Sequence, residues 1–190
     1  MNEIPIEVSA RHVHLSEGDL EELFGEGFAL DKMKDLSQEG EFASEQLVSI
    51  KTVKKEINNV RVLGPCRKLT QVEISKTDAY ELGLTPPMKE CTRVDGEMAE
   101  TITLCNGDRC LERAAAIVAY RHLHLSPQKA QELGLKDDDN ISVRVTGERS
   151  LTFHNVLVRV AENFRAHMHI DLDEGNAAGI LEKGTGEIIE

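Results

Sequence analysis

Two nearly identical heptads occur in this chain: Ala10-Arg11-His12-Val13-His14-Leu15-Ser16 and Tyr120-Arg121-His122-Leu123-His124-Leu125-Ser126. Residues i and i+2 of an extended strand point to the same face, so each His-x-His pair would present two imidazoles side by side. On an α-helix the same residues would lie about 200° apart and could not share a ligand position. The repeated pattern therefore predicts metal ligands on β-structure, built twice.

A helix start follows each heptad. Ser16-Glu17-Gly18-Asp19 has the pattern of a capping box, and Ser126-Pro127 that of an N-cap with proline at the first helical position. Glycines at 25 and 134, each after a Glu-Leu-containing segment, are typical helix stops. Both repeats are thus predicted to run from a strand into a short helix.

A second correspondence lies further along the chain. Asn59-Val60-Arg61-Val62 aligns with Asn155-Val156-Leu157-Val158 at an offset of 96 (155 − 59 = 96). The same offset places Gln71–Ser75 on His167–Asp171, so that Glu73 takes the place of His169. We interpret the chain as an internal duplication. Each half then offers three possible metal ligands: His12, His14 and Glu73, and His122, His124 and His169.

The segments between these blocks alternate apolar and polar residues, as short strands do. Strands are predicted at 46–53, 57–63, 101–105, 141–145 and 151–160, with short helices also at 77–82 and 173–178, and a loop at 86–96. The predicted fold class is α+β, mainly β: two similar small β-barrels capped by short helices and related by internal duplication.

Composition restricts the function. The 190 residues carry a net charge of −12, which argues against nucleic-acid or membrane binding. No apolar run approaches 18 residues and the N-terminus lacks a signal-peptide pattern, so we expect a cytoplasmic protein. The four cysteines show no Cys-x-x-Cys spacing; Cys105 and Cys110 could pair in a hairpin, but reduced thiols are the expectation for the cytosol.

Other residues have competing interpretations. Arg67 follows a Gly-Pro turn shortly before Glu73, and suits either oxyanion recognition or an ordinary exposed position. Cys66 is read as a packed small residue rather than a nucleophile. We expect His154 to be structural or solvated, and His167, on the strand face of His169, to be at most a supporting or weak ligand. Arg11 and Arg121 suit ion pairing as well as substrate contact.

Together these residues resemble the PduL-type phosphotransacylases (phosphate propanoyltransferases). The resemblance runs from about residue 4 to residue 180 and rests on the motifs Val8–Ser16, Lys34–Gln38, Val62–Pro65 with Arg67, Thr70–Ser75, Arg121-His122 and Met168–Asp171. It implies the reaction acyl-CoA + phosphate ⇌ acyl phosphate + CoA, with propanoyl- or acetyl-CoA, at a dinuclear zinc site.

The resemblance also implies residue roles. Two Zn²⁺ ions per chain would be held by crossed sets, with Glu73 joining His122 and His124 and His169 joining His12 and His14. Arg67 would be catalytic and contact phosphate and thioester, and Arg67 and Ser9 would contact coenzyme A. The domains implied are residues 11–120, and residues 121–190 completed by the N-terminal strand within 1–10.

Two departures from the family pattern stand out. The family's Pro-Pro-x-Arg-x-Ser-Gly stretch corresponds here to Pro86-Pro87-Met88-Lys89-Glu90-Cys91-Thr92, where lysine replaces the bidentate arginine. Tyr120 stands where a small residue is common.

The expected partners are acyl-CoA or CoA, phosphate or acyl phosphate, and a second copy in a homodimer. Because no N-terminal extension precedes the first strand, a free cytoplasmic enzyme is expected rather than one targeted to a microcompartment.

Two alternative functions would use similar residues. A cupin-like metal-dependent oxygenase or isomerase also uses His-x-His, Glu and His on a β-barrel, but its Glu follows the pair within a few residues, whereas Glu73 lies far downstream of His14. A non-catalytic metal-binding module would hold the same ligands without turnover.

Overall fold

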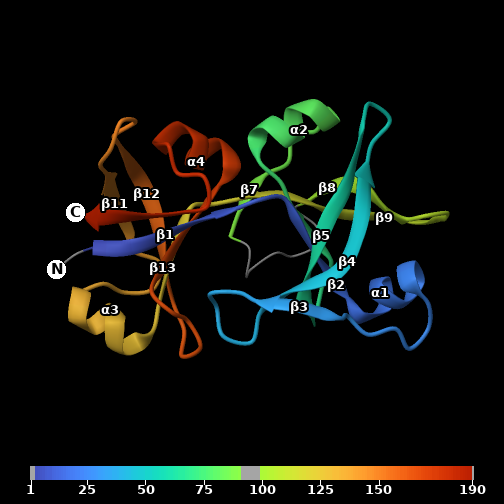
Figure 1. The fold of residues 1–190 in the computed structure, drawn as a ribbon, viewed down its shortest axis with the longest axis horizontal. Helices are drawn as coiled ribbons and strands as arrows, with labels where there is room; N and C mark the ends of the chain where they lie inside the picture. Colours follow the sequence, from blue (N-terminus) through green and yellow to red (C-terminus); the bar gives the residue numbers. More distant parts are fainter. Residues whose placement is uncertain (1–2, 91–98, 190) are drawn as a thin grey trace. The chain divides into compact units, whose positions relative to one another are not determined.

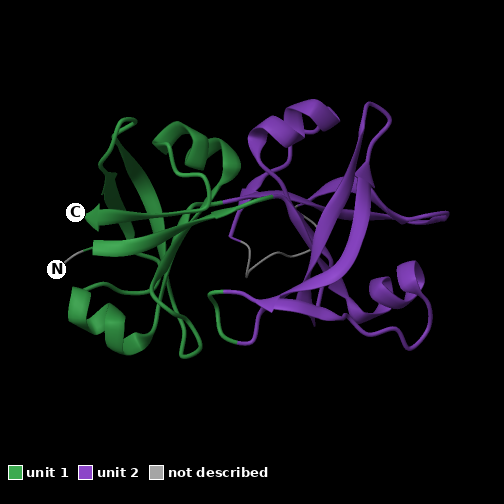
Figure 2. Cartoon of the chain, viewed as in Figure 1, with its two compact units in different colours: residues 1–10, 37–39, 120–190 green, residues 11–36, 40–119 purple. Residues whose placement is uncertain are grey.

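The computed structural model describes residues 3–90 and 99–189 (Figure 1). Two compact units divide the chain: unit 1 contains residues 1–10, 37–39 and 120–190, and unit 2 contains residues 11–36 and 40–119 (Figure 2). Strands predominate among the described residues, and the four helices found there are short: α1 (Glu17–Phe24), α2 (Lys76–Leu82), α3 (Pro127–Leu133) and α4 (Leu172–Ala178). The predicted α+β, mainly β class is therefore confirmed.

Unit 1 is built on a closed six-stranded barrel in the order β1-β13-β10-β12-β11-β14. Its strands are β1 (Glu3–Ser9), β10 (His122–Leu125), β11 (Asn140–Val145), β12 (Leu151–Val160), β13 (His167–Asp171) and β14 (Lys183–Ile188). Strand β10 runs antiparallel to β13 and parallel to β12, so the second His-x-His pair lies between two neighbours.

Unit 2 contains the matching ring of pairings, β9-β6-β2-β5-β4-β8, and β8 closes it by pairing with β9. These strands are β2 (His12–Ser16), β4 (Phe42–Lys51), β5 (Glu56–Arg67), β6 (Gln71–Glu73), β8 (Glu100–Asn106) and β9 (Arg109–Ala119). Two further strands attach to the ring, β3 (Lys32–Asp35) on β4 and β7 (Met88–Lys89) on β9.

The register of the two barrels matches the duplication. In unit 2, His12 lies opposite Glu73 and Val13 opposite Val72; in unit 1, His122 lies opposite His169 and Leu123 opposite Met168. The central pairs are buried: Val13, Val72, Leu123 and Met168 are each 0% exposed. The predicted duplication is thus present in the strand pairing itself, and apolar residues between the histidines fix that register because a one-residue slip would expose them.

The first strand of each repeat belongs to the barrel of the other repeat. Strand β1 leads into β2 of unit 2 but pairs with β13 and β14 of unit 1. Strand β9 leads into β10 of unit 1 but pairs with β6 and β8 of unit 2. Ile4 and Ile6 of β1 are 1% and 0% exposed within the core of unit 1, so the exchanged strand is an integral part of that barrel.

The helix ends follow the sequence signals. Ser75 and Asp171, equivalent under the duplication, each complete a reciprocal capping box at the start of α2 and α4. Ser126 caps α3 with Pro127 at its first turn. The capping box predicted at Ser16 holds only in half: the Ser16 hydroxyl accepts from the Asp19 N–H, but the Ser16 N–H donates to Thr70 Oγ1, because this nearby hydroxyl competes for it.

We expect Ser75→Ala to lower the free energy of unfolding by about 1 kcal/mol, because it removes the acceptor for the Asp78 N–H at the start of α2. Urea denaturation followed by circular dichroism measures the change. Lys76→Ala, at an exposed position of the same helix, is the control and should change stability by less than about 0.5 kcal/mol. Equal losses in the two variants would contradict the capping role.

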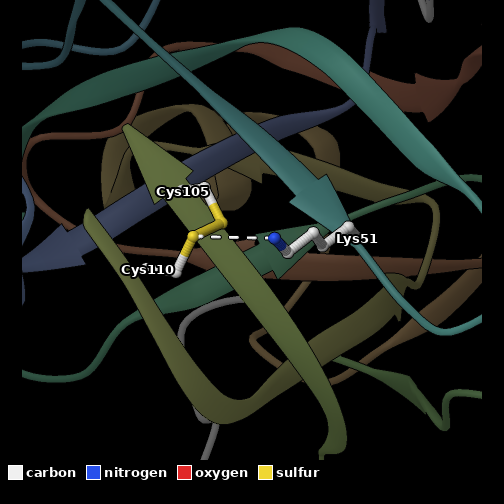
Figure 3. Close-up of a disulfide and its surroundings, with 3 residues drawn as sticks. All are labelled: Lys51, Cys105 and Cys110. Carbon is white, nitrogen blue, oxygen red and sulfur yellow. Dashed lines mark hydrogen bonds between the residues drawn. A yellow bond between two sulfur atoms is a disulfide. The ribbon is translucent and has the colours of Figure 1, made fainter. Parts of the chain in front are cut away.

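One expectation about the cysteines is wrong. Cys105 and Cys110 form a disulfide across the β8–β9 hairpin, and Lys51 Nζ lies 3.7 Å from Cys110 Sγ (Figure 3). The two residues are direct partners in the antiparallel register and their Cα atoms are 4.2 Å apart, so the hairpin itself brings the thiols together. Cys91 and Thr92, the last two residues of the altered Pro86–Thr92 stretch, lie outside the described residues.

None of the helices among the described residues has the length and apolar character needed to cross a membrane. Most predicted strands are confirmed with small shifts at their ends, whereas β3, β9 and β14 were not predicted from the sequence patterning. The stretch predicted as a loop at 86–96 contains the short strand β7, which pairs in parallel with the end of β9.

Candidate metal centre

The first candidate ligand set lies on two adjacent strands of unit 2. His12 and His14 project from β2, and Glu73 projects from β6 directly opposite His12. Glu73 Oε1 lies 3.5 Å from His12 Nε2 and 4.0 Å from His14 Nε2, and one ligand atom from each residue falls within 4.8 Å of the others. Three donors therefore converge as one metal ion requires.

The second candidate ligand set has the same arrangement in unit 1. His122 and His124 lie on β10, and His169 lies on β13 opposite His122. The ring centroids of the three histidines are 4.6–5.2 Å apart, and their ligand atoms also lie within 4.8 Å of one another. Within each unit the donors group as the duplication predicts. The crossed grouping implied by the family resemblance takes donors from both units, and it stays a prediction.

The electrostatics of the first set favour metal-binding protonation states. Burial lowers the pKa of His14 well below its usual value, helped by the positive charges of Arg67 and His12, so the ring is neutral at pH 7. Burial acts to raise the pKa of Glu73, but its interactions with His12, His14 and Arg67 outweigh this and hold that pKa below its usual range. A neutral imidazole beside an ionised carboxylate is the form that binds a cation.

Arg67 lies at the end of β5, close to the first set. Its Nη1 is 3.9 Å from Glu73 Oε1, and its Nη2 donates to Glu41 Oε1 at 3.0 Å. The guanidinium is 26% exposed, so it is neither an ordinary surface arginine nor fully buried. Its planar fork carries positive charge to the edge of the ligand set, a geometry that suits an oxyanion.

The remaining residues singled out in the sequence take different places. Ser9 ends β1 and pairs with Asp171 of β13 in unit 1. His154 is exposed and its Nδ1 lies 2.9 Å from Ser142 Oγ, whereas His167 Nε2 lies 4.0 Å from Glu7 Oε1 and outside the ligand set. Burial, with the nearby Glu17 carboxylate, raises the pKa of Cys66, which does not favour a reactive thiolate.

The repeated arginines form equivalent ion pairs. Arg11 Nη2 lies 2.7 Å from Asp78 Oδ1, and Arg121 Nε lies 2.7 Å from Glu174 Oε1. Asp78 and Glu174 are themselves equivalent under the duplication (174 − 78 = 96) and occupy the third position of their helices. Of the two interpretations of Arg11 and Arg121, the structure therefore shows ion pairing that ties each His-x-His strand to a helix start.

Two glutamines contact the ligand sets and were given no role from the sequence. Gln71 Nε2 donates to Glu73 Oε1 at 2.6 Å, and Gln38 Nε2 lies 3.3 Å from His169 Nε2. The signal for Gln71 was available, because it lies two residues before Glu73 and so shares its strand face. Gln38 is 131 residues from His169 in sequence, and no local pattern places the two together.

The residues of the two ligand sets are suited to a metal ion in their donor chemistry, and one hydrogen bond orients a histidine of the second set for metal binding. His122 Nδ1 lies 2.7 Å from the Tyr120 carbonyl oxygen. A carbonyl only accepts, so Nδ1 must carry the proton and Nε2 carries the lone pair, as in histidines whose backbone partner orients them for a metal. Imidazole and carboxylate donors in sets of three, leaving room for further ligands, suit zinc at a reactive site.

Comparison with known proteins identifies the family. A family model described as phosphate propanoyltransferase matches residues 5–181. The chain belongs to the phosphate propanoyltransferase family. The phosphate propanoyltransferase of Thermotoga maritima is 46% identical over 187 residues, covering 98% of this chain and 87% of the relative. That of Clostridioides difficile is 44% identical over 187 residues, covering 98% and 89%.

Membership of the phosphate propanoyltransferase family confirms the resemblance drawn from the sequence motifs, which extended over the same part of the chain. It makes this protein an acyltransferase enzyme with phosphate acyltransferase activity. The cupin-like oxygenase and the non-catalytic module are correspondingly disfavoured.

Proposed function

We propose that this enzyme interconverts acyl-CoA and phosphate with acyl phosphate and CoA, using two zinc ions per chain and propanoyl- or acetyl-CoA as the thioester. The observation that carries the proposal is the pair of equivalent three-donor sets, one of them with Arg67 at its edge, in a phosphate acyltransferase. Phosphate and CoA are both highly charged anions, and the chain has a net charge of −12, so local cations are needed to bring them together.

The six proposed ligands are those of the two sets, with His12, His14 and Glu73 as one group of donors and His122, His124 and His169 as the other. When bound, the zinc ions would supply positive charge that offsets the repulsion between the two anions and polarises the thioester carbonyl. The crossed pairing of donors implied by the family uses the same six residues, so both arrangements require the same side chains.

The chemistry balances without a covalent acyl-enzyme. An oxygen of HPO₄²⁻ attacks the thioester carbonyl carbon, and the new C–O bond converts the carbonyl into a tetrahedral oxyanion. The oxyanion collapses, the C–S bond breaks, and its electron pair leaves on the CoA sulfur. The proton released by the phosphate ends on the thiol. The reverse reaction follows the same path.

Arg67 is the proposed catalytic residue. Its guanidinium can donate two parallel N–H bonds to phosphate, which fixes the nucleophilic oxygen relative to the carbonyl and stabilises negative charge as it develops. The pairing with Glu41 holds the guanidinium in place before substrate arrives. Ser9, at the end of the exchanged strand β1, is the proposed further contact to coenzyme A.

Thiol release from propanoyl-CoA tests this function directly. We expect zinc-loaded protein to release CoA thiol only when phosphate is present, and to form acyl phosphate in equal amount, because phosphate is the attacking group. Removing zinc with a chelator should lower the rate at least about 100-fold, and adding zinc back should restore it.

Sulfate in place of phosphate is the control, because it matches the shape of phosphate but forms no stable acyl product. Thiol release at the same rate without phosphate would make the protein a thioesterase. Full activity in protein shown to lack zinc would remove the metal from the proposal.

A further inference from the structure

An aromatic ring covers one face of a proposed zinc ligand. Phe164 stacks on His124 with ring centroids 3.9 Å apart and an angle of 18° between the ring planes. Phe164 is partly buried, and among the described residues it lies outside the hydrophobic cluster that fills the unit 1 barrel. Its close aromatic partner is therefore the histidine and not the general core.

The loop that carries Phe164 has a counterpart in the other repeat. It follows β12 and precedes β13, as the loop after β5 precedes β6, and the offset of 96 places Phe164 on Lys68 and Asn163 on Arg67. In unit 2 this loop region delivers Arg67 to within 3.9 Å of Glu73. In unit 1 it delivers a ring onto His124. The two equivalent segments, the end of β5 with its following loop and the loop after β12, thus supply a cation to one ligand set and an apolar cover to the other.

The Phe164 loop is held by a buried amide. Gln38, 4% exposed, accepts from the Arg165 N–H through Oε1 at 3.1 Å, and its Nε2 donates to the Arg165 carbonyl at 3.4 Å. The Gln38 amide therefore both accepts a hydrogen bond from the backbone of Arg165, next to Phe164, and donates one to it. The same Nε2 lies 3.3 Å from His169 Nε2. One residue links the loop under Phe164 to a second histidine of the same set.

We propose that Phe164 is a positioning residue that fixes the ring plane of His124 for metal binding. This inference rests on the proposed zinc function. The nitrogen lone pairs of imidazole lie in the plane of the ring, so a ring stacked on its face restrains rotation without competing for them. Orientation of this kind by a neighbouring group tunes the affinity of a ligating histidine for its metal.

Zinc affinity measured by competition with a chromophoric chelator tests the role. We expect Phe164→Leu to lower the affinity for one of the two zinc ions about 10-fold or more, because it removes the planar ring at one set only. The affinity for the other zinc ion should not change. Phe164→Tyr keeps the ring and should stay within about 3-fold of the wild type. Phe164→Met keeps apolar bulk without a ring and should behave like Phe164→Leu, which provides a second variant should the first fail to fold.

Phe28→Leu is the matched control, because Phe28 stacks on Phe24 in unit 2 with centroids 5.0 Å apart. It should leave both zinc affinities unchanged. The absorption spectrum of the cobalt-substituted protein gives a second measurement, because its bands depend on the geometry of the ligands around each cobalt ion. Phe164→Leu should alter the bands of one cobalt ion, whereas loss of packing alone would leave them unchanged.

The outcomes separate this inference from the function on which it rests. Wild-type protein that binds no zinc would overturn both. Wild-type protein that binds two zinc ions, with folded Phe164→Leu or Phe164→Met binding both as tightly and giving an unchanged cobalt spectrum, would overturn the role of Phe164 and leave the proposed function standing.

Discussion

A protein carrying both His12→Ala and Glu73→Ala is expected to lose at least about 100-fold in phosphate-dependent thiol release, because each change removes a proposed metal ligand outright. Its zinc content distinguishes the two possible groupings of donors. If donors group within a unit, one set loses two of its three ligands and one zinc ion remains with wild-type affinity. If they are crossed, each set loses one ligand and both affinities fall.

The double variant His12→Ala/His169→Ala is the matched control, since it gives the opposite pattern. Within-unit grouping then removes one ligand from each set, and crossed grouping removes two ligands from one set. Each double variant changes two partly exposed polar side chains and leaves Val13, Val72, Leu123 and Met168 in the cores, so the fold should survive, as circular dichroism would verify. Two zinc ions at wild-type affinity in either double variant would contradict the ligand assignment.

Arg67→Ala is expected to lower turnover about 10²–10³-fold with both zinc ions retained, because it removes the donors proposed to stabilise charge on the reacting phosphate. Arg67→Lys keeps the charge but loses the planar two-pronged geometry, so it should recover only part of the rate. The measurement is the rate of thiol release at varied phosphate concentration, with zinc content determined on the same samples.

Arg144→Lys controls for a general effect of arginine replacement. Arg144 is 53% exposed in unit 1, where its Nη1 lies 3.8 Å from Glu187 Oε2, and it should be replaceable without kinetic effect. Wild-type kinetics in Arg67→Ala would remove Arg67 from the reaction. Loss of zinc together with activity would instead give Arg67 a role in holding the first ligand set.

Much of the local structure could be predicted because the signals are local. Capping serines and terminal glycines marked the helices, and alternation marked strands such as β12, whose predicted and observed bounds coincide. Strand β9 was not predicted because residues 115–118 are buried in succession, so the sequence there does not alternate between apolar and polar residues. The Cys105–Cys110 disulfide was not predicted because cysteines of cytoplasmic proteins are usually reduced, although the geometry of a short hairpin allows the pair to form.

The candidate site was predictable to the extent that it is repeated. Glu73 and His169 were found because the duplication aligned them, and the structure brings each to its His-x-His pair. Gln38 and Phe164 have no equivalent signal: each reaches its histidine through tertiary folding, Gln38 across 131 residues of chain. Supporting residues of this kind are brought to the site by tertiary packing, which the spacing of residues along the chain does not predict.

The exchanged strand β1 has a consequence for how this protein is made. Residues 3–9 leave the ribosome long before β13 and β14, the strands with which they pair. The barrel of unit 2 can close while translation continues. Ile4 and Ile6, in contrast, cannot be buried until the strands of the unit 1 core have been translated. The unit 1 barrel therefore cannot close before β13 and β14 have been translated, and until β1 docks, β14 presents an unpaired edge to which a neighbouring polypeptide could add a strand.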